Sequence, residues 1–263
     1  MKNAFPIKCI YFVLLMNYPC SAIAQTIQQM EVALNQHLKR IEHFAYLSHR
    51  TDETAYDSLV LENIYFEEKL LLFANNNPEI LTYEFPLLRN ENFNIATSSD
   101  RKFRIFSWDL QTGGTMHFYD NVFVYAHNKK IVAYSPELPE GSPGGYYSDI
   151  YQFRNDENAF YLAYQHRTLS NRDLHQEFQI YSIEKDSLIE NHKMILTKAG
   201  FTSKLGFPFN FYSVVDKNER PIRLIKYNNA LQTITLPVVT ENGDVTKKKI
   251  VYQYNGHYFT KQQ

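Results

Sequence analysis

Between residues 26 and 74 the hydrophobic positions recur at steps of three and four, which is the period of an amphipathic α-helix. The stripe of the first predicted helix consists of Ile27, Met30, Leu34, Leu38, Ile41 and Ala45. The stripe of the second consists of Tyr56, Leu59, Asn63, Phe66 and Leu70, widened by Leu71 and Phe73. Thr51 or Asp52 can cap this second helix. The run Asn-Asn-Asn-Pro at 75–78 ends it, because proline cannot continue a helix.

From about Tyr83 onward the pattern changes to runs of aromatic and β-branched residues, separated by clusters of Asn, Asp, Gly, Ser and Pro. We expect strands at 103–108, 116–125, 131–134, 150–153, 160–164, 177–183, 211–215, 222–227, 233–239 and 248–254. The run 103–106 is apolar on both alternating faces, so we expect this strand to be covered on both sides. Asn242-Gly243 indicates a tight hairpin near the end of the chain.

A faint repeat runs through the strand region. Asp100, Asp156 and Asp216 each stand in a polar turn that precedes a strand ending in an aromatic residue. Each unit has room for about four strands, as a propeller blade does, but three units are too few for a closed propeller. Blade-like four-stranded units, a sandwich, a barrel and an open array therefore remain alternatives, and chance recurrence of turn residues explains the repeat equally well.

Together these patterns predict a mainly β (α+β) fold made of antiparallel meanders. The helical hairpin, residues 25–77, has one apolar side that needs a surface to cover. The antiparallel β domain, residues 78–263, provides such a surface. We therefore expect the N-terminal helical hairpin to pack against the β domain.

The first 24 residues have the three-part layout of a secretory signal peptide. Lys2 and Lys8 make a basic start, a short apolar run follows at 9–16, and Ala22-Ile23-Ala24 forms a cleavage site before Gln25. The apolar run is much shorter than the roughly 20 residues of a membrane-spanning helix. A retained anchor and a lipid anchor on Cys20 are the alternatives to cleavage after Ala24.

Cleavage would also remove both cysteines of the sequence, Cys9 and Cys20. The mature chain would then have no disulfide, no cysteine zinc site and no thiol catalysis. An exported protein without disulfides fits the periplasm or the outer surface of a Gram-negative bacterium. After the signal, no apolar run is long enough for a transmembrane span.

The charge balance is close to neutral, with 27 basic and 28 acidic residues. Without a basic stripe, nucleic acid is not expected as a partner. The sequence contains no Gly-x-Ser-x-Gly elbow, no P-loop and no His-Glu-x-x-His motif. His37, His43 and His49 stand six apart on the first helix and do not share a face, so we expect surface or edge positions. Ser182 begins a Ser-x-x-Lys match at the end of a strand, where that motif lacks its catalytic context.

We expect no metal and no cofactor. The segments 155–158 and 216–219 carry oxygen donors of the kind that calcium binds, but they lack the alternating spacing and central glycine of a dedicated calcium loop. Asn and Asp are also the ordinary residues of solvated turns. We therefore interpret both segments as turns.

The stretch Ser-Trp-Asp-Leu-Gln-Thr-Gly-Gly-Thr-Met-His-Phe at 107–118 concentrates several unusual residues. Gly113-Gly114 can supply the positive φ angles of a reversal between two strands, which explains the stretch as a turn. In that hairpin Asp109 lies opposite His117, where the carboxylate would raise the imidazole pKa. Trp108 is expected to be mostly buried. The alternative is a binding corner for a sugar or peptide formed by Trp108, Asp109 and His117.

A second candidate is the loop at 136–147, which contains three prolines and three glycines and ends in Tyr146-Tyr147. Long ordered loops in compact domains are often functional, although a plain connection between meanders is as good an explanation. Tyr146 and Tyr147 are added to the ligand-binding candidates, because tyrosines can line an aromatic groove.

The absence of a catalytic motif favours a non-catalytic protein. We expect a binding or interaction module for a glycan or an envelope protein. A glycan or peptide hydrolase with dispersed carboxylates is the first alternative, since such carboxylates leave no local motif. A structural or assembly subunit of the cell envelope is the second.

Overall fold

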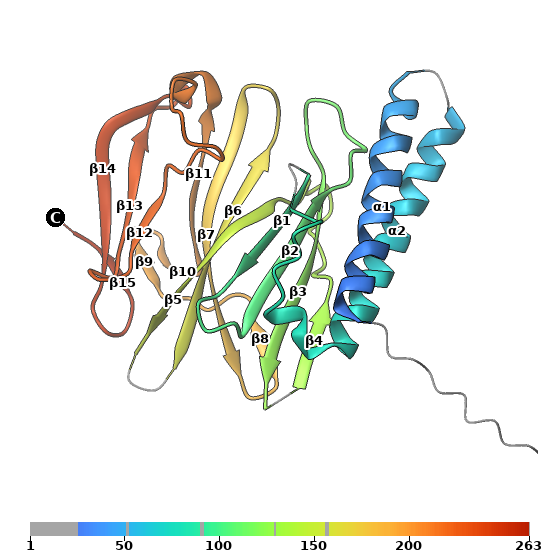
Figure 1. Ribbon diagram of the computed structural model, residues 1–263. Coiled ribbons are helices and arrows are strands. Elements are labelled where there is room, and N and C mark those ends of the chain that lie inside the picture. Colours follow the sequence, from blue (N-terminus) through green and yellow to red (C-terminus); the bar gives the residue numbers. More distant parts are fainter. Residues whose placement is uncertain (1–25, 51–52, 90–91, 129, 156–157, 263) are drawn as a thin grey trace, which may run out of the picture.

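The computed structural model describes residues 26–50, 53–89, 92–128, 130–155 and 158–262. The described chain forms a stack of four layers, which are a pair of helices followed by the first, second and third β-sheets (Figure 1). The helices are α1 (Ile27–Ser48) and α2 (Glu53–Asn76), followed by the 3-10 turn η1 (Pro78–Leu81). The predicted mainly β fold with a packed N-terminal hairpin is thus confirmed. Neither helix is long and apolar enough to cross a membrane.

The first sheet is the antiparallel meander β1-β2-β3-β4, with β1 (Phe93–Thr97), β2 (Phe103–Asp109), β3 (Tyr119–His127) and β4 (Lys130–Tyr134). The second has the order β11-β7-β6-β5, and β8 also pairs with β7. Its strands are β5 (Tyr146–Arg154), β6 (Ala159–Thr168), β7 (Asp173–Glu184), β8 (Ser187–Ile189) and β11 (Lys204–Asn210).

The third sheet has the order β10-β9-β15-β14-β13-β12, in which β15 and β9 are parallel and the other pairs antiparallel. Its strands are β9 (Ile195–Thr197), β10 (Gly200–Thr202), β12 (Lys226–Asn228), β13 (Thr233–Val239), β14 (Val245–Tyr254) and β15 (Phe259–Lys261). The three sheets therefore differ in strand number and order and are not equal four-stranded units.

Three hydrophobic layers hold this stack together. The first lies between the hairpin and the first sheet, and Phe106 and Trp108 of β2 point into it. The neighbouring positions Phe103 and Ile105 point into the second layer, between the first and second sheets. The third layer, which includes Phe178, fills the space between the second and third sheets. Strand β2 is covered on both faces, as its apolar pattern predicted.

The helices follow their predicted stripes with two corrections. A capping box formed by Thr26 and Gln29 starts α1, and all six predicted stripe residues of this helix are buried. In α2 the stripe begins at Ala55, four residues before Leu59, while Tyr56 is 47% exposed. His37 is not a surface residue, because α2 covers it. The two expected caps of α2, at positions 51 and 52, lie outside the described residues.

Several strand predictions also need correction. The segment predicted at 211–215 is the 3-10 turn η2 (Phe211–Val214), because the Asn210 side chain accepts a hydrogen bond from Tyr212 N and caps it. Of the segment predicted at 222–227, only residues 226 and 227 lie in a strand, β12, and β3 begins at Tyr119 rather than at Met116. The hairpin at Asn242-Gly243 is confirmed: it joins β13 to β14, and Gly243 has φ 85°.

Candidate ligand-binding site

The predicted pair at the base of the β2–β3 hairpin is present. Asp109 ends β2, and its Oδ2 lies 2.5 Å from Nδ1 of His117. This hydrogen bond is the main cause that raises the pKa of the His117 imidazole. The positive φ angle of the connection falls on Gln111, at 55°, and not on the two glycines. Gly113 serves a different need, because a Cβ there would lie 2.0 Å from the carbonyl oxygen of Met116.

Two of the five predicted ligand-binding residues lie in the core. Trp108 is fully buried, and its Nε1 donates to Oδ1 of Asn63 on α2 at 3.1 Å. Tyr147 is buried between the first two sheets, with its hydroxyl 3.1 Å from that of Tyr181. Neither side chain faces solvent in this fold.

The other three candidates come together through Tyr119. The ring of His117 stacks at 6.3 Å on Tyr119, and Tyr119 contacts Tyr146 at 5.4 Å. Tyr119 N also donates to Pro143 O at 2.9 Å, which places the proline- and glycine-rich loop beside the start of β3. Beyond Tyr146 the row of rings continues to His166, stacked at 4.9 Å. The predicted corner thus leads into a polar network in the second sheet.

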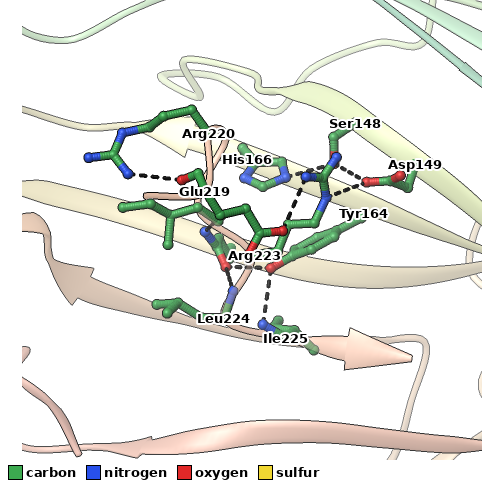
Figure 2. A network of polar contacts seen from close by, with 11 residues as sticks. Ser148, Asp149, Tyr164, His166, Glu219, Arg220, Arg223, Leu224 and Ile225 are labelled. Atoms are coloured by element: carbon green, nitrogen blue, oxygen red, sulfur yellow. Dashed lines mark hydrogen bonds and ion pairs between the residues drawn. The ribbon is translucent and has the colours of Figure 1, made fainter. Parts of the chain in front are cut away.

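Figure 2 shows this network, which lies around a bulge in β5. Between Tyr147 and Asp149 the register with β6 shifts, so Ser148 is the extra residue. Such a bulge re-aims side chains. Ser148 Oγ lies 2.8 Å from His166 Nε2 and donates to Asp149 Oδ2 at 2.7 Å. The same carboxylate oxygen accepts from Arg223 Nε at 3.0 Å.

The position of Arg223 is fixed by the segment around it. Tyr164 on β6 accepts a hydrogen bond from Ile225 N at 3.0 Å and donates to Gln176 Oε1 at 2.5 Å. Gln176 Oε1 also accepts from Leu224 N at 2.9 Å. These buried bonds tie the backbone on the C-terminal side of Arg223 to the second sheet, so the guanidinium is held toward Asp149.

The serine, histidine and aspartate of this network do not form a nucleophilic triad. Burial lowers the pKa of His166 to about 3, so the imidazole is neutral. The Asp149 carboxylate forms a salt bridge with Arg223 and accepts the hydrogen bond from the Ser148 hydroxyl, so the hydroxyl proton points at Asp149. His166 Nε2–H then donates to Ser148 Oγ. A general base needs the opposite polarity, with a nitrogen lone pair that accepts the hydroxyl proton.

Next to this network lies a cleft of about 440 Å³, which we call the β1–β5 cleft. It forms where the edge strand of the first sheet, β1, meets the edge strand of the second, β5. Its lining is mostly polar and comprises Glu84, Arg89, Ile95, Ala96, Thr97, Ser98, Ser99, Arg101, Arg104, Ser148, Asp149, Ile150 and Tyr151.

Arg104 is the unusual residue of the cleft, because a charged side chain near the start of β2 is only 1% exposed. Its Nε donates to Thr97 Oγ1 at 2.7 Å, and its Nη1 donates to the carbonyl oxygens of Ile80 and Tyr83 at 2.6 and 2.7 Å. All of these partners are neutral. Burial lowers the pKa of the guanidinium to about 10, so it stays charged at neutral pH.

The remaining charges of the cleft do not cancel that of Arg104. Glu84 accepts a hydrogen bond from Arg89 at 3.2 Å, and Asp149 is paired with Arg223. Arg101 stands exposed in the β1–β2 turn. Within the described ranges, neither Arg101 nor Arg104 forms an ion pair with a carboxylate, so the cleft has an excess of positive charge.

This cleft was not predicted from the sequence, although one signal was present. Arg104 interrupts an apolar strand in Arg-Lys-Phe-Arg-Ile-Phe, where alternation places it on a buried face. Such a residue needs a special environment. No group of three or more residues that could hold a metal ion occurs in the part of the chain that the structure describes. Comparison of the sequence with protein-family models and with curated proteins finds no match.

Proposed function

We propose that this chain is an exported, non-catalytic binding protein that takes an anionic glycan in the β1–β5 cleft. The observation that carries the proposal is Arg104, a buried guanidinium on the cleft wall with only neutral partners. A carboxylate or sulfate group of a ligand would supply the opposite charge. Hydrogen bonds between an arginine and such a charged group are stronger than those between neutral groups.

The other residues that line the β1–β5 cleft favour a sugar ligand over a simple ion. The hydroxyls of Thr97, Ser99 and Ser148 are of the kind that exchange hydrogen bonds with sugar hydroxyls, and Tyr151 adds an aromatic ring. The volume of about 440 Å³ lies within the range of ligand pockets, roughly 300–1,000 Å³. Export to the periplasm or outer surface of a Gram-negative bacterium would bring the cleft to envelope glycans.

The hydrolase alternative receives less support from this geometry. Glycosidases need two carboxyl groups about 5–10 Å apart on either side of the scissile bond. Asp149 and Glu219 both bind Arg223, so the guanidinium fills the space between them. The aspartate is held as an acceptor by an arginine, which does not suit a general acid.

The test is binding of uronic-acid and sulfated oligosaccharides, with neutral oligosaccharides of equal length as the comparison. We expect only the acidic ligands to bind, with an affinity that falls as salt rises. Arg101→Ala should weaken binding at least about tenfold, because it removes an exposed charge without touching the core. Arg172→Ala removes an exposed arginine that does not line the cleft and serves as the control. Equal binding of neutral sugars, or an Arg101→Ala variant that binds normally, would contradict the proposal.

A further inference from the structure

Helix α2 is apolar on the side that faces away from the sheets as well as on the side that packs on them. Large hydrophobic residues between 38% and 61% exposed occur along its length: Tyr56, Val60, Leu61, Ile64, Tyr65 and Leu72. A helix that is hydrophobic all round is normally covered on all sides. Contiguous exposed apolar surface of this kind marks an interaction site.

The spacing of this outer face is that of a helix–helix seam. Leu61, Tyr65, Glu68 and Leu72 follow one another at steps of four, three and four. Alternating steps of three and four keep one narrow stripe facing a partner helix, as in coiled coils. A polar residue inside such a stripe, here Glu68, specifies register rather than adding stability.

The outer surface of the hairpin is divided by charge. On α1 and just after its end, Lys39, Arg40 and Arg50 are exposed together with Glu42, whereas α2 exposes Asp57 and Glu68. A second hairpin turned by a two-fold rotation would place each basic helix against an acidic one. An isologous dimer interface requires this self-complementarity.

We propose that two copies of this chain pair through the outer surfaces of their hairpins, with α2 of each copy lying on α1 of the other. The 24 residues of α2 are about 36 Å long, and two neighbouring helices are about 20 Å wide. Their common footprint of about 700 Å² is close to the roughly 800 Å² per partner of a stable interface.

The charges of α2 favour a second copy over a membrane surface as the occupant. Helices that lie on membranes carry Lys and Arg around their apolar face, which attract anionic lipids. The apolar face of α2 instead contains the carboxylates Asp57 and Glu68. These carboxylates would be repelled by lipid phosphates and attracted by Lys39 and Arg50 of a second hairpin.

Sedimentation of the purified protein over about 1–100 µM tests the proposal, because this range covers micromolar dissociation constants. We expect twice the mass of one chain at the upper concentrations. Leu61→Glu and Leu72→Glu should each give a single chain throughout, with unchanged circular dichroism. Leu231→Glu places the same substitution at an equally exposed leucine in another part of the molecule and should leave the dimer intact.

A charge exchange tests the pairing of α1 with α2. Lys39→Glu combined with Arg50→Glu should weaken the dimer at least about tenfold, by placing like charges together. Adding Asp57→Lys and Glu68→Lys should restore it. A wild-type chain that stays single at about 100 µM, or a dimer that survives Leu72→Glu, would overturn the proposal. Neither result bears on the β1–β5 cleft, whose ligand binding is measured separately.

Discussion

At the scale of single residues, the hydrogen bond between Asp109 and His117 changes the acid–base behaviour of the imidazole. The bond favours the charged form, and it outweighs partial burial, which opposes it. The folded-state pKa lies above the unfolded value. The pair therefore stabilises the fold fully below the unfolded pKa of His117, and this stabilisation is lost as the pH rises through the folded pKa.

We predict that Asp109→Asn lowers the pKa of His117, because the amide removes the negative charge and keeps the shape. An NMR titration of the His117 ring resonances in both proteins measures this difference. Resonances of the third sheet should be the same in both, which shows that the fold is retained. An unchanged titration midpoint would mean that the carboxylate does not control this histidine.

Asp120 on β3 differs from His117, because the fold disfavours its charged form. Burial, with a smaller repulsion from Glu67 of α2, raises the pKa of its carboxyl to about 6. At pH values between the pKa of Asp120 in the unfolded chain and about 6, this carboxyl is deprotonated in the unfolded chain but still protonated in the folded chain. The stability therefore falls as the pH rises through this window.

Asp120→Asn should accordingly stabilise the protein at pH 7.5, by about 1–2 kcal/mol after allowance for solvent screening, and have little effect at pH 4. Urea unfolding at the two pH values measures the free energy of unfolding. Glu137→Gln makes the same charge change at an exposed position and should shift stability much less. An equal effect at pH 4 and pH 7.5 would rule out the titration as its cause.

Single residues could be placed from the sequence where the decisive neighbour was close along the chain. The Asp109–His117 pair followed from hairpin register. His37 could not be placed in this way, because it is buried against Glu62 of the other helix, with which it forms a side-chain hydrogen bond. Spacing within one helix says nothing about a partner on another. Arg104 was overlooked for the same reason, since carbonyl oxygens near η1 hold it.

At the scale of elements, Asn63 ties helix α2 to the first sheet. Its Oδ1 accepts from Trp108 Nε1, and its Nδ2 donates to Leu110 O at 3.0 Å. Both contacts join the helix to β2 and to the residue that follows it. The sequence pattern had placed Asn63 in the middle of an apolar stripe, where a polar residue calls for such partners.

Asn63→Ala should therefore lower the free energy of unfolding by about 2–4 kcal/mol, because it leaves the Trp108 indole N–H and the Leu110 carbonyl without these partners in the core. Chemical denaturation compares the variant with the wild type. Asn76→Ala, on an exposed part of the same helix, loses only a local bond to Leu72 O and should cost less than about 1 kcal/mol. Equal costs for the two variants would contradict this role of Asn63.

The strands differ in how well the sequence predicted them. Long strands such as β2, β6 and β13 were predicted, because each contains many β-branched or aromatic residues that favour a strand. The three-residue strands β8, β9, β10 and β15 are too short to carry a period. In β11, Gly206 and Pro208 interrupt the run of strand-forming residues. The glycine is required at position 206, because a Cβ there would lie 2.4 Å from Gln176 O. These strands are formed by their neighbours rather than by local preference.

At the scale of the whole molecule, the aromatic residues between the first two sheets act as one layer. The ring of Phe103 contacts Phe123 of its own sheet at 5.8 Å. It also contacts Tyr161 and Tyr181 of the second sheet at 5.6 and 5.3 Å. The chain has 20 Tyr and 19 Phe residues, so rings fill spaces that aliphatic residues fill in most β proteins.

Phe103→Ala should destabilise the protein by about 3–5 kcal/mol, because the cavity opens at the contact between two sheets. Calorimetry should show a single transition that moves to lower temperature. Phe201→Ala removes a ring that is 51% exposed on the third sheet and should have a much smaller effect. Two separate transitions in the variant would show that the sheets unfold independently.

Trp108 is the only tryptophan of the chain, and it stands at the contact between α2 and β2. Its indole lies 5.0 Å from the ring of Phe66, in a layer that water does not reach. Its fluorescence should therefore be blue-shifted and should move to the red when the hairpin leaves the sheet. The many tyrosines report on the sheets by their near-ultraviolet circular dichroism. One native chain thus carries two optical signals that can separate detachment of its helices from melting of its sheets.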